Sequence, residues 1–203
     1  MSRKLRWILL ALVVVVLCVS LSYYKSVVYL EIKTTHVDTI EIYRTEFTPK
    51  PIISISPELG KLKLSKGSYY IRYVGAEGYA DTFKLIQLSE RNQQVSYDAP
   101  FSSSHLAQIL SSESSAIRAA ITAAFPNVKS YQIQSGVLYR NGEWYGTTLR
   151  YSGPDIFNAD TIRLMAHKNN GVWTVSTTKP DITLSKLLYP SIPDDIIKSV
   201  NNL

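Results

Sequence analysis

The sequence is poor in the residue types that most enzymatic chemistry uses. Among 203 residues there are one cysteine, Cys18, and three histidines. Cys18 lies inside an apolar run, so the remainder of the chain has no thiol for a disulfide or for nucleophilic catalysis. Paired cysteines and a His-Glu-x-x-His motif are absent, and His105 and His167 stand where we expect solvent. We therefore expect no metal, no cofactor and no catalytic residue.

Other motifs that would indicate an enzyme are also missing. The serines lack a Gly-x-Ser-x-Gly motif, and the nine glycines fall at turns and strand bends instead of in a phosphate-binding loop. His36 and Asp38 lie on one side of an expected strand, but two side chains are too few for a metal site. Asp155, Asn158 and Asp160 offer oxygen ligands at a spacing that differs from a calcium-binding loop. These residues are expected to serve turns and surfaces.

Charge of one sign is not concentrated either. The chain has 22 Lys and Arg against 16 Asp and Glu, a formal net charge of +6. Arg3, Lys4 and Arg6 account for half of that excess, which leaves the rest of the chain nearly balanced. A nucleic-acid-binding surface needs a dense basic stripe, so we expect no nucleic-acid partner.

A single long hydrophobic segment occupies the N-terminal region. The apolar run from Trp7 to Val19 carries no charge, and residues 7–24 would span roughly 27 Å as a helix, close to the hydrocarbon thickness of a bilayer. The basic residues before the run favour a cytoplasmic N-terminus. The pattern predicts residues 1–25 as a cytoplasmic tip and transmembrane signal-anchor, with membrane lipid contacting residues 7–24. Residues 26–203 would then be extracytoplasmic, in the cell envelope, on a single-pass cell membrane protein.

One other interpretation of this segment stays open. Ser20 and Ser22 are small residues at the positions that signal cleavage requires, so cleavage after Ser22 would release a secreted, soluble binding module. Lipidation of Cys18 is disfavoured because Leu17 precedes it, where a lipoprotein signal has a small residue. The anchor is the preferred interpretation, since the apolar centre of a cleaved signal is shorter, about 7–15 residues.

Residues 26–98 predict an all-β antiparallel sandwich. Apolar and polar side chains alternate in several short runs, as at Ile40 and Ile42, and turn residues separate the runs. The expected strands are Val27–Ile32, Thr39–Arg44, Pro51–Ser56, Lys61–Leu64, Ser68–Val74, Asp81–Leu88 and Gln94–Tyr97. So many short strands within one segment favour two packed antiparallel sheets.

The stretch GSYYIRYVGAEGY, residues 67–79, resembles the end of a PEGA domain, a small β-sandwich common in bacterial envelope proteins. The shared features are a glycine turn, an alternating strand with aromatic and aliphatic positions, and a final Gly-Tyr bend. The matching positions are Gly67, Tyr69, Ile71, Tyr73, Gly78 and Tyr79. The motif that names the family has only a loose counterpart in residues 56–60. The PEGA-like resemblance implies an architectural or binding module and assigns no catalytic residues.

Residues 99–203 predict an α+β domain, with helices followed by a four-strand antiparallel meander. Two helices are expected before Pro126, with a break where Ser111 or Ser112 caps the second one. The expected strands are Val128–Arg140, Trp144–Tyr151, Thr161–Lys168 and Val172–Thr177, with tight turns at Asn141-Gly142 and Asn170-Gly171 and a short helix in SIPDDIIKSVNN. In architecture alone, this order resembles cystatin-like and nuclear-transport-factor-type shapes, which host binding and catalysis alike.

Aromatic residues are abundant, with 14 tyrosines and three tryptophans. Those in the expected hairpins are Tyr69, Tyr70, Tyr73 and Tyr79 in the first domain and Tyr139, Trp144, Tyr145 and Tyr151 in the second. Such residues serve sheet cores and also protein or glycan interfaces. The sequence predicts a non-catalytic binding or scaffolding protein whose partner is an envelope protein or a glycan. The alternative is a ligand carrier or an enzyme with a pocket between helix and sheet in the C-terminal domain.

Overall fold

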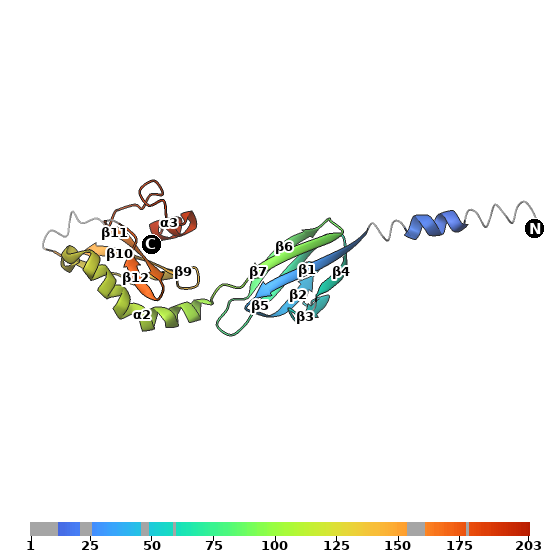
Figure 1. The fold of residues 1–203 in the computed structure, drawn as a ribbon, viewed down its shortest axis with the longest axis horizontal. Coiled ribbons are helices and arrows are strands. Elements are labelled where there is room, and N and C mark those ends of the chain that lie inside the picture. The colour runs from blue at the N-terminus through green and yellow to red at the C-terminus, as the bar shows by residue number, and fades with distance from the viewer. Residues whose placement is uncertain (1–11, 21–25, 46–48, 59, 154–160, 178) are drawn as a thin grey trace, which may run out of the picture. The chain divides into compact units, whose positions relative to one another are not determined.

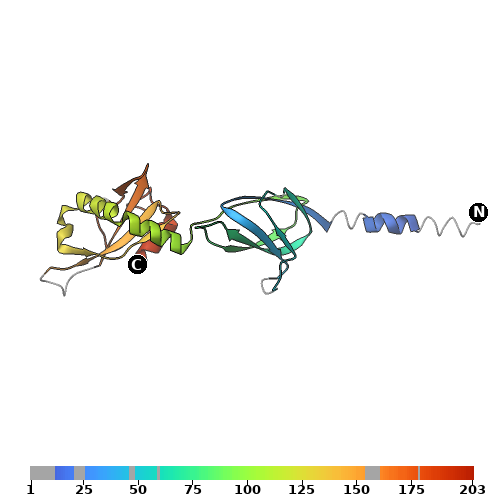
Figure 2. The ribbon, with the colours of Figure 1, turned by 90° about the horizontal axis from the view of Figure 1, so that it is seen from below.

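The chain divides into two compact units, Met1–Ala99 and Pro100–Leu203. A computed structural model describes residues 12–20, 26–45, 49–58, 60–153, 161–177 and 179–203 (Figure 1). In this part of the chain, the first unit contains two β-sheets and the second contains one sheet with helices (Figures 1 and 2). Each unit has its own hydrophobic core.

The predicted transmembrane anchor is wrong for the described part of the chain. Residues 12–20 are helical. None of the described helices is both long enough and apolar enough to cross a membrane. Residues 1–11 and 21–25, which include the alternative cleavage site after Ser22, lie outside the described residues. The predicted cell-membrane location, with residues 26–203 extracytoplasmic in the cell envelope, is contradicted along with the anchor.

The first unit is built from a three-stranded and a four-stranded sheet (Figure 1). The first sheet has the order β4 (Lys61–Ser65), β1 (Val27–Thr35) and β7 (Asn92–Asp98); the second has β3 (Ile53–Ile55), β2 (Val37–Tyr43), β5 (Gly67–Gly75) and β6 (Thr82–Leu88). The β1–β7 pair is parallel, whereas the other described pairs of this unit are antiparallel. The all-antiparallel prediction is therefore wrong at this pair. The reason is that β7 follows a strand of the other sheet and is not joined to β1 by a hairpin.

The core of the first unit lies between the two sheets and follows from alternation along the strands. On β5, Tyr69, Ile71 and Tyr73 are buried, whereas Tyr70 and Arg72 are half-buried on the opposite face. Strand β4 alternates in the same way, since its two leucines are buried and its lysines are exposed. Inward side chains from both sheets form one cluster. The alternation of apolar and polar side chains in the sequence therefore determines which face of each strand packs against the other sheet.

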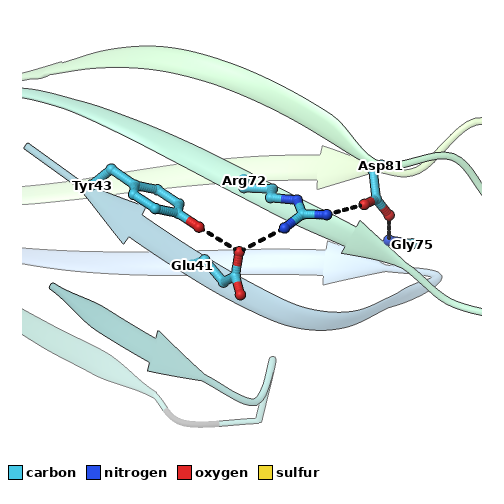
Figure 3. A network of polar contacts seen from close by, with 5 residues as sticks. All are labelled: Glu41, Tyr43, Arg72, Gly75 and Asp81. Atoms are coloured by element: carbon cyan, nitrogen blue, oxygen red, sulfur yellow. Dashed lines mark hydrogen bonds and ion pairs between the residues drawn. The ribbon is translucent and has the colours of Figure 1, made fainter. Parts of the chain in front are cut away.

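A charged network covers part of the outer face of the four-stranded sheet (Figure 3). Arg72 donates from its two terminal nitrogens to Glu41 at 3.2 Å and to Asp81 at 2.7 Å, and the Tyr43 hydroxyl donates to Glu41 at 2.7 Å. Asp81 also accepts from the backbone N–H of Gly75 at 3.1 Å. The hydrogen bond to Glu41, together with burial, raises the pKa of Tyr43, and the hydrogen bond to Asp81 raises the pKa of Arg72. Because each charge has its partner, the network holds neighbouring strands in register.

Two buried tyrosines of β5 differ in the surroundings of their hydroxyl groups. Tyr69 donates a hydrogen bond to the carbonyl oxygen of Ser65 at 2.9 Å. Tyr73 is fully buried and stacks on Tyr97 with 4.1 Å between ring centroids, but its hydroxyl has no hydrogen-bond partner within the described ranges. Burial, with a smaller electrostatic contribution from Tyr97, raises the pKa of Tyr73 to about 12.

Removing these two hydroxyls separately is expected to have different effects on the free energy of unfolding. Tyr69→Phe loses a hydrogen bond and should cost about 1 kcal/mol at pH 7, whereas Tyr73→Phe should change stability by less than about 0.5 kcal/mol. A tyrosine whose pKa is raised on folding contributes stability that is present below about pH 10 and is lost as the pH rises toward 12. Tyr73→Phe should therefore reduce the loss of stability at alkaline pH.

Urea denaturation followed by far-ultraviolet circular dichroism at about pH 7, 9 and 11 measures both effects. Tyr69→Phe is the matched control, because it removes the same atom from the same strand. The fluorescence of Trp144 and Trp173 reports on the second unit, whose transition should not move. Equal losses in the two variants at pH 7, or an unchanged alkaline loss in Tyr73→Phe, would contradict the assignment.

The second unit has an antiparallel sheet between two helical layers. The strand order is β12 (Val172–Val175), β11 (Ile162–Asn169), β10 (Trp144–Tyr151) and β8 (Tyr131–Ile133), and β9 (Val137–Tyr139) also pairs with β10. The helices are α2 (Ser103–Ala124), the 3-10 turn η1 (Pro126–Ser130) and α3 (Asp194–Asn201). The expected first strand of the meander is divided into β8 and β9, so the predicted four-strand meander is wrong in this detail.

The two hairpin turns of this unit are confirmed. Asn141 and Gly142 have φ values of 54° and 81°, and Asn170 and Gly171 have φ values of 49° and 80°. Asparagine and glycine tolerate this left-handed region better than other residues, so these pairs reverse the chain where the sequence predicts. The terminal helix is also confirmed as α3, with two aspartates in its first turn.

Helix α2 is continuous, which corrects the predicted break. Ser102 caps it, because its hydroxyl accepts a hydrogen bond from the backbone N–H of His105 at 3.2 Å. Ser112 does not cap a second helix. Its hydroxyl donates to the carbonyl oxygen of Ile109 at 2.9 Å within the same helix, a bond that mid-helix serines make without ending the helix. The helix ends before Pro126, as predicted.

Both faces of the sheet are covered. Alternate residues of β10 show this, since Tyr145 and Leu149 pack in the cluster with α2 while Trp144 packs in the cluster with α3. Residues 144–149 are consequently all buried. The sequence predicts α3 but not its place on the second face of the sheet.

Candidate functional site

The candidate site is a pocket on the second unit, between one face of α2 and the connection from β8 to β9. The helix contributes side chains spaced three or four residues apart, which is the spacing of one helical face. These are Ala107, Leu110, Ser111, Ser114, Ile117 and Arg118. The facing wall consists of Gln134, Ser135, Gly136 and Tyr145. The pocket has a volume of about 330 Å³, within the range of small-molecule sites.

The helical wall is fixed to the sheet by a polar contact on another side of α2. Glu113 accepts a hydrogen bond from the indole N–H of Trp173 at 2.6 Å and forms an ion pair with Lys168. The three side chains are mostly buried. Because Lys168 lies on β11 and Trp173 on β12, this contact ties the middle of the helix to two strands.

The facing wall is fixed by hydrogen bonds to β10. The backbone N–H of Gln134 donates to the carbonyl oxygen of Thr148 at 3.0 Å, and the buried Thr147 hydroxyl donates to the carbonyl oxygen of Gln134 at 2.8 Å. These bonds bind the start of the β8–β9 connection to the sheet. Both walls are therefore held by the fold before any ligand binds.

Gly136 lets Tyr145 approach the backbone of this wall. A Cβ atom on Gly136 would lie 2.3 Å from Cζ and 2.4 Å from the hydroxyl oxygen of Tyr145, too close for any side chain. Tyr145 is only 5% exposed, and its ring also meets Trp173 edge-on at 6.4 Å. The phenol thus forms part of the pocket floor, and its hydroxyl end lies against the glycine.

The lining combines apolar surface with hydrogen-bonding groups. Leu110, Ile117 and the Tyr145 ring provide the apolar part, while the serine hydroxyls and Gln134 provide polar atoms. Arg118 supplies the one charged side chain among the lining residues that the structure describes. No lining residue within those ranges is a carboxylate, imidazole, thiol or amine, so the pocket offers a surface for binding and no ordinary general base.

The residues considered from sequence as metal ligands are not brought together. His36 lies in a turn with φ 59°, stacks on Tyr79 at 4.2 Å, and approaches Asp98 with 3.0 Å between Nδ1 and Oδ1. Its partner is therefore Asp98 and not Asp38. Hydrogen bonds from Thr35 and then from His36 lower the pKa of Asp98. Across the described ranges, no three His, Cys, Asp or Glu side chains form a group that suits a metal ion.

The remaining histidines pack against aromatic rings. His105 meets Phe101 edge-on at 4.6 Å, and His167 stacks on Trp144 at 4.1 Å. Both are half-buried, so the expectation that they face solvent is only partly correct. Asp155, Asn158 and Asp160 lie outside the described residues.

A second hollow of about 300 Å³ lies on the first unit, at one end of β1 and β7. Lys33, Thr34 and Thr35 line it from β1, and Ser96, Tyr97 and Asp98 line it from β7. Its carboxylate already accepts hydrogen bonds from Thr35 and His36. Lys33, the other charged side chain of this hollow, forms an ion pair with Glu31 at 3.5 Å. Because both charged groups are engaged, the hollow is a weaker candidate than the pocket at α2.

The sequence predicts, as an alternative, a pocket between helix and sheet in this unit, but it does not single out the residues on the helical wall. Ser114, Ile117 and Arg118 lie in the expected helical segment before Pro126, and no motif marks them. No sequence pattern marked Gly136 as a pocket residue. Its role is to leave room for the ring of Tyr145, and it is not required by a turn. A break in the strand pattern at residues 134–136 was the available clue.

Comparison with known proteins adds no assignment. No protein-family model, no curated protein and no solved structure matches this chain. The resemblance of residues 67–79 to a PEGA domain therefore stays a prediction.

Proposed function

We propose that the protein is a non-catalytic binding protein whose second unit holds a small amphipathic ligand in the pocket between α2 and the β8–β9 connection. The observation that carries the proposal is this pocket of about 330 Å³, with an apolar floor and polar atoms at its walls. The scaffold around it supports binding, because Glu113 fixes the helix and Thr147 fixes the opposite wall.

The composition of the lining favours binding over catalysis. Ser111, Ser114 and Tyr145 carry hydroxyl groups, but a serine nucleophile needs an adjacent base to remove its proton. The described lining contains no such base. The hydroxyls are suited to donate or accept hydrogen bonds from a bound molecule and so to set its orientation.

The proposal is tested by titrating the full-length, ¹⁵N-labelled protein with 1-octanol, a neutral amphiphile. We expect saturable amide shifts confined to residues 107–118, 134–136 and 145. A ligand with about ten non-hydrogen atoms is expected to have a dissociation constant of roughly 10 μM to 1 mM, from typical ligand efficiencies. Non-saturable shifts, or shifts spread over both units, would contradict the proposal.

A pair of adjacent serines provides the matched control. Ser114→Trp places an indole in the pocket and should weaken octanol binding at least about tenfold, because the ring occupies the ligand's volume. Ser115 is exposed on the same helix but does not line the pocket. Ser115→Trp should leave binding unchanged. Equal loss in the two variants would show that the effect comes from the helix and not from the pocket.

A further inference from the structure

We infer that the natural ligand of this pocket carries a carboxylate, which Arg118 binds, joined to a short apolar chain. The inference rests on the proposed function and specifies the chemical class of ligand. It comes from the charge of the pocket, from the donors around it and from its volume.

Arg118 brings an unbalanced positive charge to the pocket. Its guanidinium has no ion pair or hydrogen bond within the described residues. Three other arginines are engaged, since Arg72 binds two carboxylates, Arg140 binds Asp195, and Arg163 binds backbone carbonyl oxygens. The exposed Arg150 has no such partner among the described residues, but it does not line the pocket. Because no described lining residue is acidic, an anionic ligand supplies the missing partner.

The neighbouring polar groups suit a carboxylate. A carboxylate accepts hydrogen bonds and donates none, and the planar guanidinium of arginine presents paired donors that match its two oxygens. Ser111 lies two helical turns before Arg118, on the same face, and can donate from its hydroxyl. The Ser114 hydroxyl donates to the carbonyl oxygen of Ser111 at 3.1 Å, so it is not counted among these donors. Tyr145 is only 5% exposed, and its hydroxyl makes no hydrogen bond to any described residue, so this group is also available as a donor.

The apolar floor and the volume limit the rest of the ligand. Ala107, Leu110 and Ile117 line the pocket beside the ring of Tyr145, which favours a hydrocarbon chain over a second polar group. A volume of about 330 Å³ equals that of about eleven water molecules at roughly 30 Å³ each. A carboxylate with a chain of about eight carbons is of this size, so octanoate is a suitable probe.

The test compares octanoate with 1-octanol on the full-length protein at pH 7 and low ionic strength. The two probes have the same chain length and differ in charge. Octanoate is expected to bind at least about fivefold more tightly, a modest gain because Arg118 is exposed. Raising the salt concentration should weaken octanoate binding and should not weaken octanol binding.

Two arginine variants identify the group responsible. Arg118→Gln should reduce the affinity for octanoate at least about fivefold, to that of the wild type for octanol. Arg150→Gln is the control, since Arg150 is an exposed arginine of the same unit that does not line the pocket. Equal affinity of the wild type for both probes, or an equal effect of the two variants, would overturn the inference and leave the proposed pocket intact. Failure of both probes to bind would overturn the proposed function itself.

Discussion

Replacing Gly146 with alanine is expected to lower the free energy of unfolding of the second unit by about 2 kcal/mol. Gly146 lies in the middle of β10, on the sheet face that α3 covers. A Cβ atom there would lie 2.3 Å from Cγ2 of Val200 and 3.2 Å from Cε2 of Tyr139. Val200 is fully buried and has a short, branched side chain, so α3 has to move away from the sheet.

A double-mutant cycle tests this explanation. Val200→Ala alone should cost about 1.5 kcal/mol, because it removes two buried methyl groups. In the double variant, the methyl group introduced by Gly146→Ala enters the space that the valine side chain vacates. The total loss should therefore be smaller than the sum of the single losses by at least about 1 kcal/mol. Urea denaturation followed by tryptophan fluorescence measures the three variants. Strictly additive losses would show that the contact with Val200 is not the cause.

The second large effect is expected at Glu113. Glu113→Ala leaves the indole N–H of the buried Trp173 and the ammonium group of Lys168 without their acceptor. The expected loss of stability is about 2 kcal/mol, since an unsatisfied buried donor keeps its full desolvation cost. Glu113→Gln retains an acceptor for Trp173 but loses the charge, so its loss should be about 1 kcal/mol.

Thermal and urea denaturation of the two variants measure this order. Glu143→Ala is the matched control, because Glu143 is an exposed glutamate of the same unit whose side chain forms no hydrogen bond or ion pair with the described residues. It should change stability by less than about 0.5 kcal/mol. A Glu113→Ala variant as stable as this control would contradict the role assigned to Glu113.

Local sequence patterns predicted the local elements of this fold. The alternation in Lys61–Leu64 places both leucines inward in β4, and Asn141-Gly142 reverses the chain because both residues adopt positive φ. The expected strand Trp144–Tyr151 coincides with β10. These features are determined by residues that lie close together in the sequence, so a local sequence pattern is enough to predict them.

Features that depend on distant residues were missed or predicted wrongly. The parallel pairing of β1 with β7 joins strands from the two ends of the first unit, and alternation gives no information about direction. The serines of α2 suggested a cap, but their hydroxyls bond within the helix once it packs on the sheet. Arg118 and Gly136 acquire their place in the pocket only through the approach of α2 and Tyr145. The residues that line the helical wall and the Gly136 contact were therefore not readable from the sequence.

The parallel β1–β7 pair also determines how the first unit would respond to mechanical tension. Because the two strands run in one direction, β1 begins at one end of their sheet and β7 finishes at the opposite end, with pairing from Tyr29 with Asn92 to Thr35 with Asp98. A pull on the chain before β1 and after β7 would slide these strands past each other in shear. The interstrand hydrogen bonds would then resist together, whereas a hairpin pulled from its open end separates one bond at a time.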